Sequence, residues 1–371
     1  MQIAIDGTEA LLAQRTGTGV YVRHLLHHLL DRNIGKDLIV LSMRGVDGDT
    51  SFIPEHQLRR LRTPMVRTFW TQARLPLHLA AHRYALVHLP DHKIPLWGAG
   101  NIIATVYDLA VFKFPEMFTP MHRRRLEWFT RDVARRARRL LAISVSTKND
   151  LVDILGVPPE RIDVTPMGAD PRVYHPAVTP HRRTLPYVLA VGALQPRKNF
   201  RLLIRAFKRA CAQCDSPVEL LIAGQRGWMW EPIEEEAKSP PFADRVHLLG
   251  YVPDEELPSL YRGALCFAMP SLYEGFGIPL VEAMACGTPV IASSTSSFPE
   301  VVGDAGLLLN PADELLWADR LVTLLRDEEL RQSLSRKAVL QARSFTWESM
   351  TAKTIEAYRT MDPGLACAGA L

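Results

Sequence analysis

The chain has 371 residues, of which 47% are hydrophobic and 23% charged, so it is long enough for two folded domains and is neither disordered nor fibrous. No apolar run reaches the roughly 18–20 residues of a membrane-spanning helix, so we do not expect an integral membrane protein. The formal net charge of +4 is unevenly distributed. Residues 1–180 contain 24 Lys and Arg and 17 Asp and Glu, whereas residues 181–371 contain 20 Lys and Arg and 23 Asp and Glu.

Short apolar runs alternate with segments of helical period along the chain. The predicted strands are residues 38–41, 102–106, 187–191, 219–223 and 265–269, and the predicted helices include residues 20–30 and 200–212. Strands that read as continuous runs of Ile, Val and Leu are typical of parallel sheets covered by helices. The pattern predicts an α/β protein with two doubly wound domains in tandem, and ligand sites at the carboxyl ends of the strands and in the cleft between the domains.

The break between the domains is expected in residues 167–186, which contain four prolines and read as a linker. We place the first domain at residues 1–175 and the second at 185–345. Strand and helix signals resume after the linker, which supports a second domain rather than an extension of the first.

Cysteine usage bears on the cellular compartment. Five cysteines, an odd and small number, are typical of reduced thiols, and the sequence does not open on a basic segment followed by an apolar one. We therefore expect a cytoplasmic protein. Cys211 and Cys214 have the spacing of a redox pair or half of a zinc site, but they lie in a predicted helix with no second pair nearby.

Two further groupings have plain structural interpretations. Asp47 and Asp49 have the spacing of an acidic metal-binding pair, but their Gly-rich surroundings indicate a loop. His78 and His82 lie four residues apart on a predicted helix and have no acidic partner in the sequence around them. No metal site is expected.

The segment 270–291 carries the strongest chemical signal. A predicted strand ends near Met269, a loop with Gly275 and Gly277 follows, and Pro279 stands where a helix would begin. A glycine-bearing loop that leads into a helix exposes backbone N–H groups beside the positive end of the helix dipole, which is a site for phosphate.

Two carboxylates flank this loop. Glu282 is expected in the first turn of the helix, where it can accept hydrogen bonds from ribose hydroxyls, and Glu274 precedes the helix and can face a sugar. From the carboxylates alone, a helix-stabilising role for Glu282 and a surface position for Glu274 remain equally open.

The run from Glu274 to Ile291 (EGFGIPLVEAMACGTPVI) strongly resembles the acidic motif of the retaining glycosyltransferases of family 4, which have the GT-B fold. Five other segments are similar to that family: residues 187–200 to its donor-phosphate segment, 248–257 to its nucleobase segment, 293–306 to the stretch that follows its acidic motif, 16–21 to its glycine loop, and 106–109 to the segment that faces the reacting sugar. The resemblance covers nearly the whole chain. It implies two Rossmann-like domains facing a central cleft, the first binding the acceptor and the second the nucleotide-sugar donor. It also implies a C-terminal helix, within residues 346–371, that returns to the first domain, with a frayed tail from residue 363 on.

The resemblance assigns roles that the residue types can perform. Arg197 and Lys198 would neutralise the donor diphosphate as the bond to the sugar breaks, in place of a metal ion. Glu274 would hold the donor sugar and Glu282 the ribose. The remaining implied contacts are Gly17 and Gly19 to the diphosphate; Gly275, Phe276 and Gly277 to the donor; Gly250 and Tyr251 to the nucleobase; and Tyr107 and Asp108 to the reacting sugar.

Two positions depart from the family's common pattern. Tyr107 stands where most relatives have histidine, so it can donate a hydrogen bond but supplies no imidazolium charge. Ala193 stands where many relatives have an arginine, which leaves Arg197 to carry more of the phosphate charge.

The implied reaction moves a hexose from a nucleotide-diphosphate sugar to a hydroxyl of a glycan or lipid-linked oligosaccharide, with retention of configuration, in surface-polysaccharide synthesis. No carboxylate is positioned as a nucleophile, which fits a front-side mechanism in which the departing phosphate takes the acceptor's proton. By analogy with bacterial mannosyl- and rhamnosyltransferases, GDP-mannose is the expected donor, and UDP-glucose or UDP-N-acetylglucosamine the alternative.

Competing hypotheses are a GT-B epimerase or phosphorylase, and a non-catalytic scaffold that binds a nucleotide sugar.

The basic character of the first half is concentrated in residues 121–140. This segment contains eight arginines and two acidic residues, Glu127 and Asp132, which gives a local charge of +6. The arginines are Arg123, Arg124, Arg125, Arg131, Arg135, Arg136, Arg138 and Arg139. Placed on the acceptor-binding domain, this cluster predicts either peripheral contact with an anionic membrane, at its inner face, or a solvated helix face. Nucleic acid is disfavoured, because only Trp128 and Phe129 are interleaved aromatics and no nucleic-acid-binding motif is present.

Overall fold

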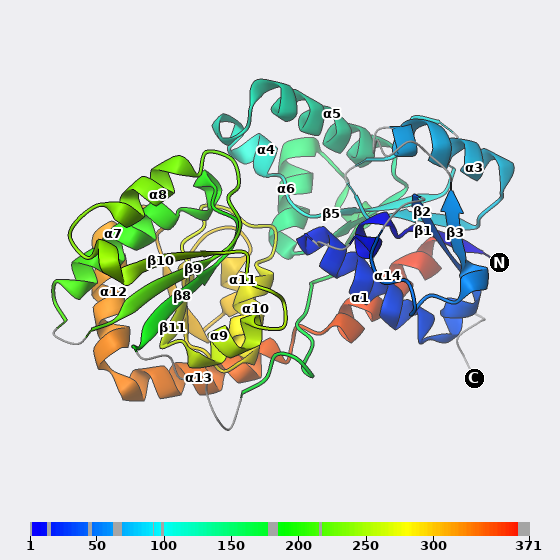
Figure 1. The fold of residues 1–371 in the computed structure, drawn as a ribbon. Coiled ribbons are helices and arrows are strands. Elements are labelled where there is room, and N and C mark those ends of the chain that lie inside the picture. The colour runs from blue at the N-terminus through cyan, green and yellow to red at the C-terminus, as the bar shows by residue number, and fades with distance from the viewer. Residues whose placement is uncertain are drawn as a thin grey trace. The chain divides into compact units, whose positions relative to one another are not determined.

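The computed structural model describes residues 2–12, 16–43, 47–61, 69–91, 93–97, 100–176, 185–214 and 217–362. The chain divides into two compact units, Met1–Met167 with Trp347–Leu371, and Gly168–Thr346 (Figure 1). Within the expected linker, residues 177–184 lie outside the described residues, as does the expected C-terminal tail, residues 363–371.

The first unit is built on a seven-stranded sheet with strand order β3-β2-β1-β4-β5-β6-β7, and each pairing is parallel. The strands are β1 (Ile3–Asp6), β2 (Leu38–Met43), β3 (Leu58–Leu61), β4 (Leu86–Leu89), β5 (Ile102–Val106), β6 (Arg139–Ala142) and β7 (Ile162–Val164). Its α-helices are α1 (Gly17–Leu30), α3 (Leu75–Ala81), α4 (Ala110–Lys113), α5 (Pro120–Arg136), α6 (Val145–Leu155) and α14 (Trp347–Met361). Every residue of β2, β4 and β5 is buried, which explains their mostly apolar sequences.

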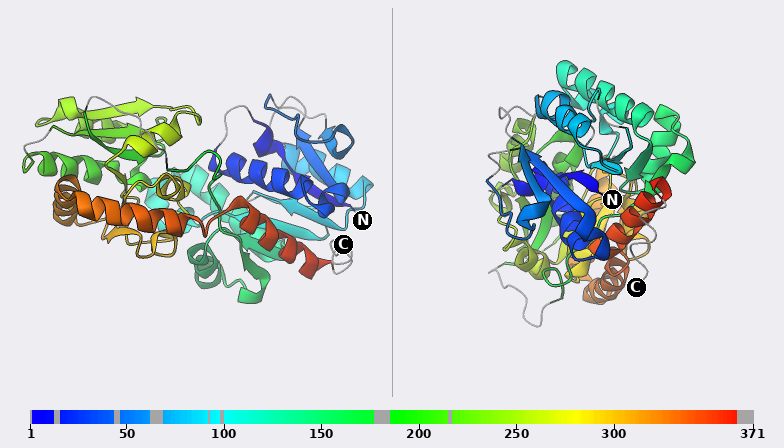
Figure 2. Two further views of the ribbon diagram at one scale, coloured as in Figure 1. Left: turned by 90° about the horizontal axis from the view of Figure 1, so that it is seen from below. Right: turned by 90° about the vertical axis from the view of Figure 1, so that its right-hand side faces the viewer.

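Helix α14 completes the first unit although it comes from the far end of the described chain. It lies beside α1 (Figure 2). Between these two helices, the rings of His24 and Trp347 stack with centroids 4.5 Å apart. His88, fully buried on β4, shares one hydrogen bond with the Tyr358 hydroxyl (2.7 Å) and another with Thr105 Oγ1 (2.9 Å). Burial lowers the pKa of His88 to about 3, so it is neutral near pH 7 and fixes α14 to the sheet without a buried charge.

The second unit is built on a six-stranded parallel sheet with strand order β10-β9-β8-β11-β12-β13. The strands are β8 (Tyr187–Val191), β9 (Glu219–Ala223), β10 (Val246–Gly250), β11 (Cys266–Met269), β12 (Val290–Ser293) and β13 (Gly306–Leu309). The helices are α7 (Phe200–Cys211), α8 (Glu231–Lys238), α9 (Leu257–Gly263), α10 (Ile278–Ala285), α11 (Phe298–Val302), α12 (Glu314–Arg326) and α13 (Glu328–Ala342). Its core packs α7 against α12 around the buried Phe207 and Trp317.

The strand orders confirm the prediction of two doubly wound parallel sheets. In each sheet the winding reverses between two central strands: between β1 and β4 in the first unit, and between β8 and β11 in the second. Ligands of such sheets bind outside the carboxyl ends of the strands at this reversal. The segments that follow β1, β4, β8 and β11 are therefore where functional side chains are expected. In the described parts of the chain, no helix combines the length and apolarity needed to cross a membrane.

Candidate active site

Three charged side chains meet at the reversal point of the second sheet. After β8 the chain forms a short 3-10 turn, Pro196–Lys198, which presents two cations toward the segment that follows β11. Arg197 Nη1 lies 2.9 Å from Glu274 Oε2, and Lys198 Nζ lies 2.6 Å from Glu274 Oε1. Arg197 also donates to the carbonyl of Tyr273 at 2.6 Å. The structure thus brings together three residues that the sequence analysis singled out separately.

This cluster is buried, and its carboxylate stays ionised. The side chains of Arg197, Lys198 and Glu274 are 13%, 12% and 10% exposed. Burial by itself would raise the pKa of Glu274, but the charges of Arg197 and Lys198 outweigh it and lower the pKa to about 2. Two cations share one carboxylate, so the cluster keeps a net positive charge that can attract a phosphate group.

The loop that carries Glu274 is fixed by serine hydroxyls from the segment after β12. Ser296 Oγ accepts from the backbone N–H of Glu274 at 3.0 Å, and its hydroxyl donates to the Glu274 carbonyl. Ser297 Oγ donates to the carbonyls of Glu274 (3.0 Å) and Phe276 (2.9 Å). These bonds set the direction of the loop before α10 begins. The ring of Phe276 is buried against Phe345, so any contact of Phe276 with a donor falls to its backbone.

A left-handed glycine determines where α10 starts. Gly277 has φ 98°, and a Cβ at this position would lie 2.8 Å from the ring of Phe298, so only glycine fits. The helix begins at Ile278, with Pro279 in its first turn as predicted. Gly275 lies within the loop held by the serines.

The prediction that Glu282 lies in the first turn of α10 is wrong. Because Gly277 caps the helix, Glu282 is the fifth helical residue and lies in the second turn, too far along the helix to stabilise its N-terminus. Its Oε2 instead accepts a hydrogen bond from the Tyr261 hydroxyl at 2.9 Å. Burial raises the pKa of Glu282 to about 7, although hydrogen bonds from Tyr261 and Tyr174 lower it in part. Sequence reasoning missed both tyrosines, which lie far from Glu282 along the chain.

The two residues expected near the nucleobase follow β10. Gly250 adopts a left-handed conformation (φ 69°) at the end of the strand, and its carbonyl accepts from the N–H of Gly224 at 2.7 Å. Tyr251 comes next and is 54% exposed. An exposed aromatic ring at the carboxyl edge of the sheet offers a flat apolar surface. The contact of Tyr251 with a nucleobase stays a prediction.

In the first unit, the expected glycine loop is part of a helix. Gly17 and Gly19 both lie in the first turn of α1, where Thr16 Oγ1 caps the helix by accepting from the N–H of Gly19 at 3.4 Å. The helix therefore starts three residues earlier than the predicted 20–30. A Cβ at Gly17 would meet nothing within 4 Å, so this end of α1 is open to an approaching group.

Tyr107 and Asp108 follow β5. The Tyr107 ring is buried edge-on against Tyr21, with centroids 5.5 Å apart, and its hydroxyl donates to the Pro90 carbonyl at 3.2 Å. Burial raises the pKa of Tyr107 well above that of a free phenol, so the hydroxyl stays neutral. Asp108 Oδ1 accepts from the N–H of Ala110 at 2.9 Å and so helps to start α4. The hydroxyl of Tyr107 is thus already engaged with the protein backbone.

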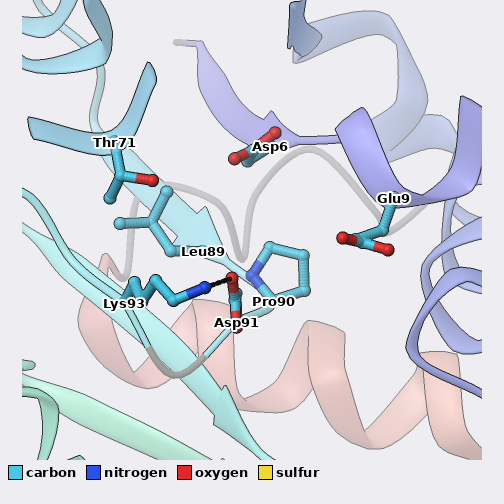
Figure 3. A pocket seen from close by; sticks show the side chains of 7 residues that line it. All are labelled: Asp6, Glu9, Thr71, Leu89, Pro90, Asp91 and Lys93. Atoms are coloured by element: carbon cyan, nitrogen blue, oxygen red, sulfur yellow. Dashed lines mark ion pairs between the residues drawn. The ribbon is translucent and has the colours of Figure 1, made fainter. Parts of the chain in front are cut away.

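Beside these residues lies a pocket that sequence reasoning missed (Figure 3). It is lined by Asp6, Glu9, Thr71, Leu89, Pro90, Asp91 and Lys93. Lys93 Nζ lies 3.6 Å from Asp91 Oδ2, and Asp6 Oδ2 accepts from the indole N–H of Trp70 at 2.8 Å. Asp6 ends β1 and Asp91 follows β4, so their positions after two apolar runs are a signal that could have identified this edge.

The groupings that the sequence analysis set aside make the following contacts. Cys211 and Cys214 are free thiols, and the described residues contain no group of three metal-ligating side chains. Asp49 pairs with Arg23 at 2.9 Å. His78 bonds the Tyr84 hydroxyl (2.8 Å) and stacks on His82.

With this geometry in place, comparison with known proteins identifies the family. Residues 15–173 match the model of Glycosyltransferase Family 4, and residues 175–341 match that of Glycosyl transferases group 1. The chain is 32% identical over 316 residues to O-antigen chain mannosyltransferase B from Escherichia coli, a match that covers 78% of this chain and 81% of that protein. The chain belongs to glycosyltransferase family 4. It is also 30% identical over 287 residues to D-inositol 3-phosphate glycosyltransferase from Paenarthrobacter aurescens (strain TC1), covering 73% and 69% of the two chains.

Solved structures confirm the fold of this glycosyltransferase. The crystal structure of Anabaena HepE in complex with UDP-glucose superposes with a TM-score of 0.74 at 19% identity, covering 97% of this chain and 100% of that one. The fold is therefore GT-B, as the resemblance implied.

The substitution Glu274→Gln tests the charge balance of the buried cluster. It keeps the shape of the side chain but leaves Arg197 and Lys198 without a neutralising charge, which should lower the free energy of unfolding of the second unit by roughly 3 kcal/mol at pH 7. A carboxyl whose pKa is depressed on folding stabilises the protein above its unfolded pKa and stops doing so as the pH falls through its folded pKa. The difference in unfolding free energy between the unaltered protein and the variant should therefore narrow as the pH falls from about 5 toward 2.

Urea unfolding of the unaltered protein and the variant at pH 7, 5 and 3.5 measures this difference. The control is Glu329→Gln, an exposed glutamate on α13, which should change stability by less than about 0.5 kcal/mol. If Glu274→Gln loses as much unfolding free energy at pH 3.5 as at pH 7, the assigned ionisation of Glu274 is wrong.

Proposed function

We propose that this glycosyltransferase moves a hexose from a nucleotide-diphosphate sugar to a hydroxyl of a glycan or lipid-linked oligosaccharide, with retention of configuration, in surface-polysaccharide synthesis. The observation that carries the proposal is the buried cluster of Arg197, Lys198 and Glu274 at the reversal point of the second sheet. A site of this kind, positive overall and closed to water on most sides, suits a diphosphate whose negative charge grows during the reaction.

The chemistry follows from the charges in the cluster. As the bond between the anomeric carbon and the phosphate oxygen breaks, its electron pair goes to the phosphate, and Arg197 and Lys198 stabilise the added charge. The acceptor oxygen bonds to the anomeric carbon on the face that the phosphate leaves, and its proton passes to a phosphate oxygen. Glu274 holds both cations in place and offers its carboxylate to the sugar hydroxyls. No metal ion is needed for this balance of charge.

Mannose from GDP-mannose is the proposed donor group. The E. coli relative, at 32% identity, is named a mannosyltransferase. UDP-glucose is the second candidate, since HepE, which shares the fold, is solved with UDP-glucose.

Thermal unfolding with candidate donors tests the proposal. We expect GDP-mannose or UDP-glucose, in EDTA, to raise the melting temperature, because a ligand at 100 times its Kd adds about 2.7 kcal/mol of stability. Arg197→Met should remove most of this stabilisation and reduce the rate of sugar transfer at least about 100-fold. Arg205→Met is the matched control, since Arg205 pairs with Glu314 (2.7 Å) and Glu236 (3.3 Å) away from the cluster, and should leave both properties unchanged.

The outcomes separate the alternatives. Stabilisation by a nucleotide sugar without any transfer to an acceptor would favour the non-catalytic scaffold. No response to GDP, UDP or dTDP sugars would overturn the proposed donor site, and full activity of Arg197→Met would overturn the role of the cluster.

The acceptor is proposed to bind the first unit, at the pocket between the ends of β1 and β4 (Figure 3). Its carboxylates can accept hydrogen bonds from sugar hydroxyls, Lys93 can donate one, and Pro90 offers an apolar surface to a sugar ring.

The substitution Asp91→Asn tests the pocket. It removes a charged acceptor and weakens the pairing with Lys93, so the KM for the acceptor should rise about tenfold while the KM for the donor stays constant. Asp319→Asn, an exposed aspartate on α12, is the control and should change neither constant. An unchanged acceptor KM in Asp91→Asn, measured in initial-rate experiments, would contradict the assignment.

Peripheral contact with an anionic membrane is proposed for α5. Its first half exposes Met121 (83%) and Trp128 (50%) beside the exposed Arg124 and Arg125. Apolar and cationic side chains side by side on one helix are typical of helices that lie in a membrane interface.

Sedimentation with vesicles tests this contact. The protein should sediment with phosphatidylglycerol vesicles at low salt and not with phosphatidylcholine vesicles. Reversing two charges in Arg124→Glu/Arg125→Glu should reduce binding at least about tenfold, whereas Arg336→Glu/Lys337→Glu on α13, with the same change in net charge, should not. Equal losses in both variants would point to net charge alone and contradict a role for α5.

A further inference from the structure

Tyr261 is placed on α9 so that its hydroxyl meets the carboxylate of Glu282 on α10. The hydroxyl donates to Glu282 Oε2 at 2.9 Å, and the side chain is fully buried. The backbone carbonyl of Tyr261 accepts from Thr288 Oγ1 at 2.7 Å, and its ring lies edge-on to Phe267 with centroids 5.5 Å apart. The phenol is therefore held in one position, and it holds one oxygen of Glu282 in turn.

A second tyrosine supports the same carboxylate. Tyr174, from the segment that precedes the second sheet, is another hydrogen-bond partner of Glu282. Its ring lies edge-on to that of Tyr261, with centroids 6.1 Å apart. A carboxylate has about four positions at which it can accept hydrogen bonds, so two phenols still leave Glu282 able to accept from a ligand.

The charged surroundings of Glu282 differ from those of Glu274. The titratable groups that act on Glu282 are Tyr261 from α9, Tyr174, Asp254 from the turn before α9, and Cys286 after α10. None of these is a cation. Burial therefore raises the pKa of Glu282 to about 7, and Asp254 adds to this shift, whereas Arg197 and Lys198 lower that of Glu274.

We infer that Tyr261, supported by Tyr174, is a positioning residue that presents the Glu282 carboxylate to the ribose hydroxyls of the donor and thereby ties donor binding to the ionisation of Glu282. This inference rests on the proposed function, because it takes a nucleotide sugar as the ligand of this site. Protonation of Glu282 removes its charge and one acceptor position, so donor binding weakens as the pH falls. Bound donor favours the ionised form of Glu282, so the carboxylate is already ionised in the complex with donor. The value of kcat therefore changes little with pH.

The test is the pH dependence of the Kd and KM for GDP-mannose and UDP-glucose. Their diphosphate is esterified at both ends, so its charge stays constant around neutral pH. In the unaltered protein, the affinity for the accepted donor should fall up to about tenfold per pH unit below an inflection near pH 7. In Tyr261→Phe, the carboxylate loses a hydrogen-bond donor, so the inflection should move up by at least about one pH unit. The KM at pH 7 should then rise at least about fivefold, with kcat changed less than about twofold.

Tyr187→Phe is the matched control, because Tyr187 is a buried tyrosine of the same unit whose hydroxyl donates to the Leu260 carbonyl at 2.8 Å. It should leave the inflection where it is. If Tyr261→Phe fails to fold, the less buried Tyr174→Phe should move the inflection in the same direction by a smaller amount. Glu282→Gln should bind weakly at every pH.

Two results would overturn this inference and leave the proposed function intact. One is donor binding that does not vary with pH, and the other is an inflection at the same pH in Tyr261→Phe and Tyr187→Phe. Failure of the unaltered protein to bind either nucleotide sugar at any pH would overturn the proposed donor site itself.

Discussion

The buried charge of Glu274 is the constraint on which the donor unit depends. A carboxylate taken out of water without partners would cost several kcal/mol, and here two cations from the turn after β8 meet it within 3 Å. To do so, the chain must bring the ends of β8 and β11 together, which the reversal of winding in the sheet achieves. The serine hydroxyls after β12 and the left-handed Gly277 then fix the loop between them. The charges that would bind a diphosphate thus also hold the edge of the sheet together.

The same short segment carries a second carboxylate in a different environment. Glu274 faces cations and stays ionised, whereas Glu282 faces phenols and titrates near neutrality. Separate environments let two chemically similar groups act differently at one pH. The difference comes from the elements packed around α10 and not from the segment itself.

Much of the fold could be predicted, because buried parallel strands leave a plain signature: all five predicted strands, such as residues 102–106 and 187–191, correspond closely to β2, β5, β8, β9 and β11. Arg197, Lys198 and Glu274 were singled out through the family resemblance, and they meet in the structure because β8 and β11 are neighbours in the sheet. The helical turn that carries Glu282 was predicted wrongly, because the start of α10 depends on the cap at Gly277. That cap depends in turn on a left-handed backbone conformation and on the nearby ring of Phe298. Tyr174 and Tyr261 could not be found, since their contacts with Glu282 arise from tertiary packing between distant segments.

Helix α14 has a consequence for how the protein is made. It belongs to the first unit, yet the ribosome synthesises it only after all of the second unit. Until then His88 lacks the Tyr358 hydroxyl, and the ring of His24 lacks Trp347. The second unit, continuous in sequence, can fold while its predecessor is still incomplete. The second unit therefore has all of its residues before the first unit does, and the first unit can complete its fold only once α14 has been synthesised.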